Sequence, residues 1–259
     1  AVGLIDLVGN TPLIQLRRVT ADLPPTVQVL AKAEWFNPSG SIKDRPALAI
    51  LTAALPALRA GRIALDSTSG NMGIAYATLG RALGVAVKLA IPANVSPERL
   101  ATLRALGVDL VLTDPTEGSD GAIRAARTLA ATEPEQYLYL NQYDNAANWR
   151  AHFDTTGPEI LRQTGGRVTH FVAGLGTSGT LVGVGRALRA ANRAIAIASV
   201  QPETAFNGIE GWKHMETAIV PGIYDPAVAD RHQTVSTEAA HAMTRRLARE
   251  EGLFVGISS

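Results

Sequence analysis

The sequence predicts an α/β protein in which parallel sheets are covered by helices on both faces. From residue 63 onward, short segments rich in Val, Ile and Leu alternate with longer segments of helical periodicity. Strands that alternate with helices of about 10–15 residues are typical of βαβ units. The chain has 259 residues, of which 46% are hydrophobic and 18% are charged, so it can bury a large core in one domain or in two lobes.

The expected elements follow from apolar periodicity and from the turn residues between them. After a turn at Gly9–Leu13, which leads into a short extended piece, strands are predicted at Val27–Ala33, Ile63–Ser67, Val85–Ile91, Asp109–Thr113, Tyr137–Leu140, His170–Ala173, Ala194–Val200 and Leu253–Ile257. Helices are predicted at Ser41–Ala54, Asn71–Leu83, Ser96–Leu106, Ser119–Ala131, Ala146–Gln163, Thr180–Ala191 and Thr237–Glu251. The helix from Ala146 either contains Gly157-Pro158 or is interrupted there. Residues 201–230 carry many turn residues and are expected to be irregular. In such sheets ligands bind beyond the carboxyl ends of strands, so the strand-to-helix loops are where function is expected.

The first of these helices is expected to follow a turn. Asn37 precedes Pro38, which disfavours helical geometry at the preceding residue. Ser41 then suits a helix N-cap, with Asp44 as its acidic partner three residues on. The helix is expected to end near Ala54, because a proline follows two residues later.

Lys43 lies in the first turn of that helix under this prediction. The partial positive charge of a helix N-terminus disfavours an ammonium group there and favours a neutral amine. A neutral, positioned amine is the form that reacts with carbonyl groups. Only four of the 24 basic residues are lysine, so arginine fills the ordinary surface role. Lys43 is therefore a candidate nucleophile, with a solvated surface lysine as the alternative.

Two further loops carry hydroxyl and amide groups between a strand and a helix. Ser67–Gly73 reads Ser-Thr-Ser-Gly-Asn-Met-Gly, and Gly174–Thr180 reads Gly-Leu-Gly-Thr-Ser-Gly-Thr. Backbone N–H groups at a helix N-terminus favour a carboxylate or a phosphate. For the first loop, an ordinary capped helix start is the alternative.

The loop at 174–180 also supports a competing interpretation. Its glycines satisfy the pattern G-x-G-x-x-G, and Glu203 follows after the next strand, as in dinucleotide-binding proteins. A nicotinamide- or flavin-dependent oxidoreductase is therefore a second candidate. Two features count against it: the pattern lies late in the chain, and the hydroxyl groups within it suit a terminal monophosphate better than a pyrophosphate.

Taken together and in order, these segments resemble the cysteine synthase family, which belongs to the fold type II enzymes that use pyridoxal 5′-phosphate. The resemblance covers nearly the whole chain, from Gly9–Leu13 through the lysine loop at 37–45 to Glu250–Ser259. It is closest to the B-type branch in three places: Phe171–Thr177, Pro221–Pro226, and the pair Asn148 and His152.

The resemblance implies a role for each candidate residue. Lys43 would bind the cofactor covalently and later take the α-proton of the substrate. Asn71 would bind the ring hydroxyl of the cofactor, and its phosphate would be held by Gly176, Thr177, Ser178, Gly179 and Thr180. The substrate carboxylate would be bound by Thr68, Ser69, Gly70, Met72 and Gln142. Lys213 would contact an anionic group of a substrate, with a surface lysine as the alternative.

Two departures from the family pattern bear on these roles. Met72 stands where the family usually has threonine, so one hydroxyl contact is lost while the backbone N–H is kept. The family also continues, beyond the position of Ser259, with a Ser or Thr that contacts the pyridine nitrogen. A truncated and catalytically impaired homologue is therefore an alternative.

The implied fold is that of a two-lobed enzyme similar to the tryptophan synthase β subunit, with twisted, parallel-type sheets flanked by helices. Residues 1–39 and 146–259 would form the larger lobe, which binds the cofactor phosphate. Residues 40–145 would form the smaller, mobile lobe, which carries the substrate-carboxylate loop. A homodimer is implied by the resemblance alone.

The implied reaction is a β-replacement, in which an activated serine loses its β-leaving group to a sulfur nucleophile. The expected product is L-cysteine or S-sulfocysteine, made from O-acetyl-L-serine or O-phospho-L-serine and a sulfur donor. Cystathionine β-synthase-type activity is the alternative within the same class of enzymes.

Composition argues against several other classes of function. The net charge of +1 gives no strong field for nucleic acid or for a membrane surface. There is no cysteine, and His152 and His214 lack metal-ligand spacing, so no metal site is expected. No apolar run reaches the roughly 18 residues that span a membrane. No secretory signal is recognisable, so a cytoplasmic protein is expected.

Overall fold

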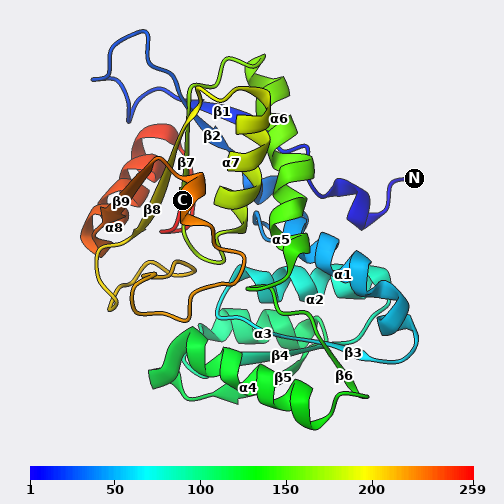
Figure 1. The fold of residues 1–259 in the computed structure, drawn as a ribbon. Helices are drawn as coiled ribbons and strands as arrows, with labels where there is room; N and C mark the ends of the chain where they lie inside the picture. Colours follow the sequence, from blue (N-terminus) through cyan, green and yellow to red (C-terminus); the bar gives the residue numbers. More distant parts are fainter.

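The computed structural model describes residues 1–259 and contains three sheets (Figure 1). The strands are β1 (Leu13–Leu16), β2 (Val29–Lys32), β3 (Ile63–Ser67), β4 (Val87–Pro92), β5 (Asp109–Thr113), β6 (Tyr137–Tyr139), β7 (His170–Gly174), β8 (Ala196–Pro202) and β9 (Arg231–Val235). The orders are β5-β4-β3-β6 and β7-β8-β9, both parallel throughout, and an antiparallel pair β1-β2. The predicted α/β class with parallel sheets is confirmed.

The helices occupy the positions between the strands that the sequence pattern predicts. They are α1 (Asp44–Arg59), α2 (Asn71–Leu83), α3 (Pro97–Ala105), α4 (Gly118–Thr132), α5 (Ala146–Ala151), α6 (Gly157–Thr164), α7 (Gly179–Ala191) and α8 (Thr237–Arg246). A π-helical turn at His152–Thr156 joins α5 to α6, and another at Leu247–Glu251 follows α8. The helix predicted from Ala146 is therefore one helical run that contains Gly157-Pro158, with a widened turn just before them. None of the helices is both long enough and apolar enough to cross a membrane.

The four-stranded sheet has helices on both faces. On one face, Ile50 of α1 and Tyr76 of α2 pack in one buried cluster with Leu89 of β4. On the other face, Leu65 of β3 packs with Ala122 of α4. Figure 1 shows this body as the lower half of the molecule. Since both faces are buried, β4 is apolar except for Lys88, and β3 is apolar up to Asp66 and Ser67 at its carboxyl end, as expected of a covered parallel sheet.

The three-stranded sheet forms a second body with α7. Leu181 of α7, Ile197 of β8 and Val228 lie in one buried cluster, and Val184 of α7 packs with Ile160 of α6. The long helical run α5–α6 lies beside α7 in Figure 1 and leads from the first body to the second. The loops after β3 and after β7, which the sequence selects for function, therefore come from two different bodies.

The predicted end of α1 is wrong. The helix passes through Pro56 and ends at Arg59, five residues beyond the predicted Ala54. A proline inside a helix removes one backbone hydrogen bond and disfavours the geometry before it. Here Leu58, beyond the proline, is 5% exposed and belongs to the main cluster of the first body. The burial of Leu58 outweighs the tendency of Pro56 to end the helix.

Two further predictions fail because strands depend on pairing. Leu253–Ile257 forms no strand, since no partner strand lies beside it, and Phe254 is exposed. Conversely, β9 was missed within a segment whose sequence, Arg-His-Gln-Thr-Val, is mostly polar. It lies at the edge of its sheet and pairs only with β8, so its side chains need not be apolar.

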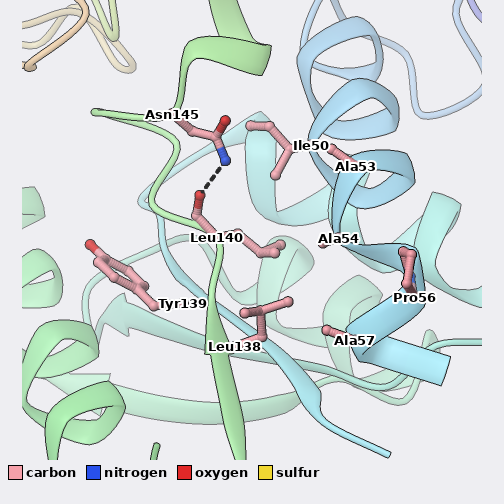
Figure 2. A pocket seen from close by; sticks show the side chains of 9 residues that line it. All are labelled: Ile50, Ala53, Ala54, Pro56, Ala57, Leu138, Tyr139, Leu140 and Asn145. Carbon is pink, nitrogen blue, oxygen red and sulfur yellow. Dashed lines mark hydrogen bonds between the residues drawn. The ribbon is translucent and has the colours of Figure 1, made fainter. Parts of the chain in front are cut away.

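An apolar hollow lies between α1 and the edge strand β6 (Figure 2). Ala53, Ala57 and Leu138 line it, and at one end Asn145 donates a hydrogen bond of 2.8 Å to the carbonyl of Leu140. None of the predicted functional residues lines this hollow.

Candidate functional site

One polar pocket brings together residues from all the predicted loops. Its lining consists of Lys43, Thr68, Ser69, Gly70, Asn71, Met72, Ser119, Gln142, Tyr143, Gly176, Thr177, Gly211, Trp212 and Lys213. Three predicted residues follow on the loop after β7 without lining the pocket: Ser178, Gly179 and Thr180. Residues from both sheets and from the segment between β8 and β9 thus surround one space, which we call the polar pocket.

Four pocket residues were not predicted as functional: Ser119, Tyr143, Gly211 and Trp212. Two of them are adjacent in sequence to a predicted residue, since Tyr143 follows Gln142 and Trp212 precedes Lys213, and Gly211 lies one position further away. Ser119 lies in the first turn of α4, whose distance from the other loops in sequence gave no hint of their proximity.

Lys43 precedes α1 rather than lying in its first turn. The helix begins at Asp44, and Lys43 occupies the N-cap position. The predicted pairing of Ser41 with Asp44 is also wrong, because the Asp44 carboxylate accepts hydrogen bonds from the backbone N–H (2.7 Å) and the hydroxyl of Ser39. As expected for a residue before proline, Asn37 is extended, with φ −66° and ψ 153°. The loop therefore folds back on the start of α1 and presents Lys43 to the pocket.

Burial makes the amine of Lys43 less basic. Desolvation lowers the pKa of Lys43, and the nearest acidic influence, Glu34, opposes this only in part. Lys43 forms no ion pair, whereas its neighbour Arg45 is paired with Glu34 and Glu159. The sequence predicts that the field of the helix N-terminus favours the neutral amine of Lys43. In the structure, burial is the main cause.

The loop after β3 presents backbone groups rather than side chains at its centre. Thr68 is buried, and its hydroxyl accepts a hydrogen bond of 3.1 Å from the N–H of Gly70. Met72 is only 2% exposed and belongs to the apolar cluster of the first body. Its side chain therefore contributes to the core, and its backbone N–H, at the start of α2, is the group left for a ligand. Arg99 donates to the carbonyl of Ser69 at 3.0 Å and holds the loop from outside.

The loop after β7 has the features of an anion-binding site. Ser178 has φ +69°, in the left-handed region that non-glycine residues rarely adopt. Its hydroxyl oxygen is buried and has no hydrogen-bond partner. It directly precedes the 13-residue helix α7, whose N-terminal N–H groups favour a negative charge. A strained residue with an unpartnered buried hydroxyl at a helix N-terminus indicates a ligand that accepts hydrogen bonds.

Asn148 connects the two halves of the pocket. Its side-chain N–H₂ donates to the carbonyl of Gln142 at 2.8 Å and to the hydroxyl of Thr177 at 3.2 Å. Its own side-chain oxygen is buried and unpartnered. In the sequence, Asn148 was noted only as a residue shared with the B-type branch. Its position between the two loops was not predicted, because three segments that are distant in the chain meet there.

Gln142 is fixed by the end of β3. Its side-chain N–H₂ donates to the carbonyl of Ser67 at 2.7 Å, and its backbone N–H donates to Asp66 at 3.0 Å. Asp66 is fully buried and also accepts a hydrogen bond of 2.9 Å from Tyr76. Burial raises the pKa of Asp66 to about 7, although these hydrogen bonds act in the opposite direction. Asp66 therefore serves as an internal support for Gln142.

His152 supports the loop after β7 from behind. Its ring nitrogens lie 3.0 Å from the hydroxyl of Thr156 and 3.4 Å from that of Thr180. Burial, with Lys43 and Arg45 nearby, lowers the pKa of His152 to about 3, so the ring is neutral at physiological pH. No group of three or more His, Cys, Asp or Glu side chains could hold a metal ion.

Lys213 reaches the pocket from the segment between β8 and β9, which extends toward the first body (Figure 1). Its ammonium lies 2.8 Å from a carboxylate oxygen of Asp120 and 5.1 Å from the ring centre of Tyr143. Its backbone N–H donates to the carbonyl of Leu175 at 2.7 Å. The side chain is buried, so the interpretation as a surface lysine is wrong.

These residues fit a phosphorylated carbonyl cofactor. The unpartnered Ser178 hydroxyl and the α7 N-terminus suit its phosphate, and the desolvated amine of Lys43 suits its carbonyl carbon. Gly176 approaches the backbone of Gly211 so closely that a Cβ would collide with the Gly211 carbonyl. At this point the backbones of two segments are in direct contact and leave no room for a side chain.

Comparison with known proteins identifies the class to which this fold and pocket belong. The family model for pyridoxal-phosphate dependent enzymes matches residues 4–259, and the chain belongs to that family. Pyridoxal phosphate is thus the cofactor, and the dinucleotide interpretation is superseded.

Within this family the chain is similar to cysteine synthases, as the resemblance in the sequence implies. It is 52% identical to a cysteine synthase of Aquifex aeolicus, with 99% of this chain and 79% of that protein covered. It is 41% identical to a cysteine synthase B of Pseudomonas aeruginosa, with 99% and 85% covered. The crystal structure of a cysteine synthase from Entamoeba histolytica superposes with a TM-score of 0.93 at 33% identity, over 100% of this chain and 79% of that one.

Proposed function

We propose that this protein catalyses the pyridoxal-phosphate-dependent formation of L-cysteine from O-acetyl-L-serine and a sulfur nucleophile. In this β-replacement the bond between the β-carbon and the ester oxygen breaks, acetate leaves with the bonding electrons, and a carbon–sulfur bond forms. The α-proton is removed before acetate leaves and is returned after sulfur has added.

The observation that carries the proposal is the convergence of three loops on one pocket. Lys43, the Thr68–Met72 segment and the Gly176–Thr177 segment all line it, although they come from different parts of the chain. Their similarity, in the same order, to cysteine synthases at 41–52% identity supports the reaction class.

The chain's own groups divide the work. When bound, pyridoxal phosphate supplies the electron sink for the carbanion at the α-carbon. We propose that the Lys43 amine takes and returns the α-proton, for which its lowered pKa is suited. The backbone N–H groups at the start of α2, with Thr68 and Gln142, would bind the substrate carboxylate. This orients the α-proton toward Lys43.

We assign the cofactor contacts by the same reasoning. Asn71 would bind the ring hydroxyl, and the loop Gly176–Thr180 would hold the phosphate through backbone N–H groups and the hydroxyls of Thr177 and Ser178. Lys213 would lie near the leaving group or the sulfur donor. The support for these roles is the position of each group in or behind the polar pocket.

Movement of two lobes is part of the proposal. We propose residues 40–145 as the smaller lobe and residues 1–39 with 146–259 as the larger one, in line with the separation of the two parallel sheets. Closure of the lobes would exclude water from the reacting carbon. A homodimer and a cytoplasmic location stay predictions that rest on the family resemblance.

The test is a visible spectrum followed by turnover. The purified protein with pyridoxal phosphate should show the absorption band of the lysine-bound cofactor, and this band should be absent from the Lys43→Ala variant. Adding O-acetyl-L-serine should shift the band, and adding sulfide should then release cysteine. A normal band without any cysteine would contradict the assigned reaction, and no band after reconstitution would contradict the assigned lysine.

A further inference from the structure

The ammonium of Lys213 is the charge in the polar pocket that a substrate anion would meet. Lys43 and Lys213 are the only cationic side chains among the lining residues, and no carboxylate lines the pocket. Since Lys43 is assigned to the cofactor, only Lys213 is left to attract an anionic leaving group. This step rests on the proposed function.

The charge of Lys213 is balanced by one carboxylate behind it. Asp120, in the first turn of α4, places one oxygen 2.8 Å from the ammonium, and the hydroxyl of Ser119 lies 3.4 Å away. The Lys213 side chain is 6% exposed and that of Asp120 is 23% exposed, so solvent screens the pair only weakly. The ammonium therefore has a carboxylate partner before any substrate arrives.

Asp120 also fixes the segment that carries Lys213. Its second carboxylate oxygen accepts a hydrogen bond of 2.9 Å from the backbone N–H of Ile219. The Asp120 carboxylate is thus bound from two sides, and hydrogen bonds from Lys213 and Ile219 lower the pKa of Asp120 although its partial burial acts against this. Since its pKa is lowered, Asp120 is ionised at neutral pH.

A phosphate ester and an acetyl ester differ in their electrostatic interaction with the Lys213–Asp120 ion pair. A phosphate monoester carries about −1.5 to −2 charges at neutral pH. It would share Lys213 with Asp120 and be repelled by the Asp120 carboxylate, whereas a neutral acetyl group would not. From this geometry we infer that Asp120 determines leaving-group specificity by neutralising Lys213, so that the site favours the neutral ester over the phosphate ester.

The test compares the two donors in matched variants. Wild type and Asp120→Asn are assayed with O-acetyl-L-serine and O-phospho-L-serine at low ionic strength, and the ratio of their kcat/KM values is the readout. Asp120→Asn keeps the size of the side chain and an oxygen for Ile219 but removes the charge. The ratio of phosphoserine to acetylserine should rise roughly tenfold or more.

Two controls separate charge from structure. Asp109→Asn removes the partner of Lys88 in the four-stranded sheet, outside the polar pocket, and should leave the ratio unchanged. The double variant Asp120→Asn with Lys213→Met should lose the gain. An equal loss of activity with both donors in Asp120→Asn would overturn the proposal, as would a wild type that already prefers the phosphate ester.

A binding measurement keeps this inference separate from the proposed function. The affinity of the Lys43→Ala protein, supplied with pyridoxal phosphate, for O-phospho-L-serine is measured by calorimetry with and without Asp120→Asn. Tighter binding in the protein that carries both Lys43→Ala and Asp120→Asn supports the role of Asp120. This holds even if wild type turns over neither ester, in which case only the proposed reaction fails. Unchanged or weaker binding overturns the role inferred for Asp120.

Discussion

Arg45 and Glu159 form a bidentate ion pair in the interior, with both N–H···O distances at 2.7 Å. Their side chains are 1% and 6% exposed. Glu159 also accepts from Lys32 at 2.6 Å, and Arg45 also donates to Glu34. This network joins the segment that carries Lys43 to α6 and to the N-terminal strands, so we expect the position of Lys43 to depend on it.

Replacing Glu159 with Gln should therefore destabilise the protein strongly. The change leaves Arg45 and Lys32 as buried cations with one acidic partner fewer. Removing one partner of a buried ion pair costs about 3–5 kcal/mol, and the free energy of unfolding in urea should fall by about that amount. Glu250→Gln, which breaks the exposed pair with Arg246, is the matched control and should change stability little. Similar effects of the two variants would contradict this account of the network.

The contribution of Glu159 to the free energy of unfolding should depend on pH. Burial alone would raise the pKa of Glu159, but hydrogen bonds from Arg45 and Lys32 lower it to about 2. Because the folded pKa lies below the ordinary value of 4.5, the stability from Glu159 is present above that pH and is lost as the pH falls toward 2. The difference in unfolding free energy between wild type and Glu159→Gln should shrink as the pH is lowered through this window. A constant difference would show that Glu159 acts through shape rather than charge.

Ser178→Ala should stabilise the cofactor-free protein but weaken the binding of the cofactor. Its buried hydroxyl has no partner, so Ser178→Ala should stabilise the cofactor-free protein by about 1 kcal/mol. Loss of a hydrogen bond to a charged phosphate costs about 1.5–3 kcal/mol, so the affinity for pyridoxal phosphate should fall at least tenfold. Thermal unfolding and cofactor titration measure the two effects.

Thr113→Val is the matched control for Ser178→Ala. The Thr113 hydroxyl is also buried and unpartnered, but it lies at the end of β5 rather than in the loop that precedes α7. Its removal should stabilise the protein without weakening cofactor binding. If Ser178→Ala behaves in the same way, Ser178 does not contact the phosphate.

Sequence predicted best what local pattern determines. The bounds of α2 and β3 are as predicted, because a strong apolar period is flanked by glycine and capping residues on both sides. The three loops that meet at the polar pocket were singled out in the sequence because each has characteristic residues just before a helix. Their convergence on one pocket followed from resemblance, since periodicity does not say which loops meet.

What sequence could not supply are contacts between distant segments. The partner of Lys213 is Asp120, 93 positions away, and nothing local to either residue indicates the other. The lowered pKa of Lys43 is likewise a consequence of burial by several segments, although the helix field alone suggested the same direction. The end of α1 was set by the burial of Leu58, which competes with local proline geometry.

Gly176 tests whether backbone contact between two segments shapes the pocket. A Cβ at this position would collide with the carbonyl oxygen of Gly211, in the segment that carries Lys213. Since the colliding atom is backbone, relief requires that the segment move away rather than that a side chain rotate. Gly176→Ala should therefore lower cofactor affinity and displace Lys213 from Asp120. Gly256→Ala, where a Cβ meets nothing within 4 Å, should change neither. Titration with pyridoxal phosphate, with a crystal structure of the variant, measures both effects, and an unmoved Gly211 with normal cofactor affinity would contradict the prediction.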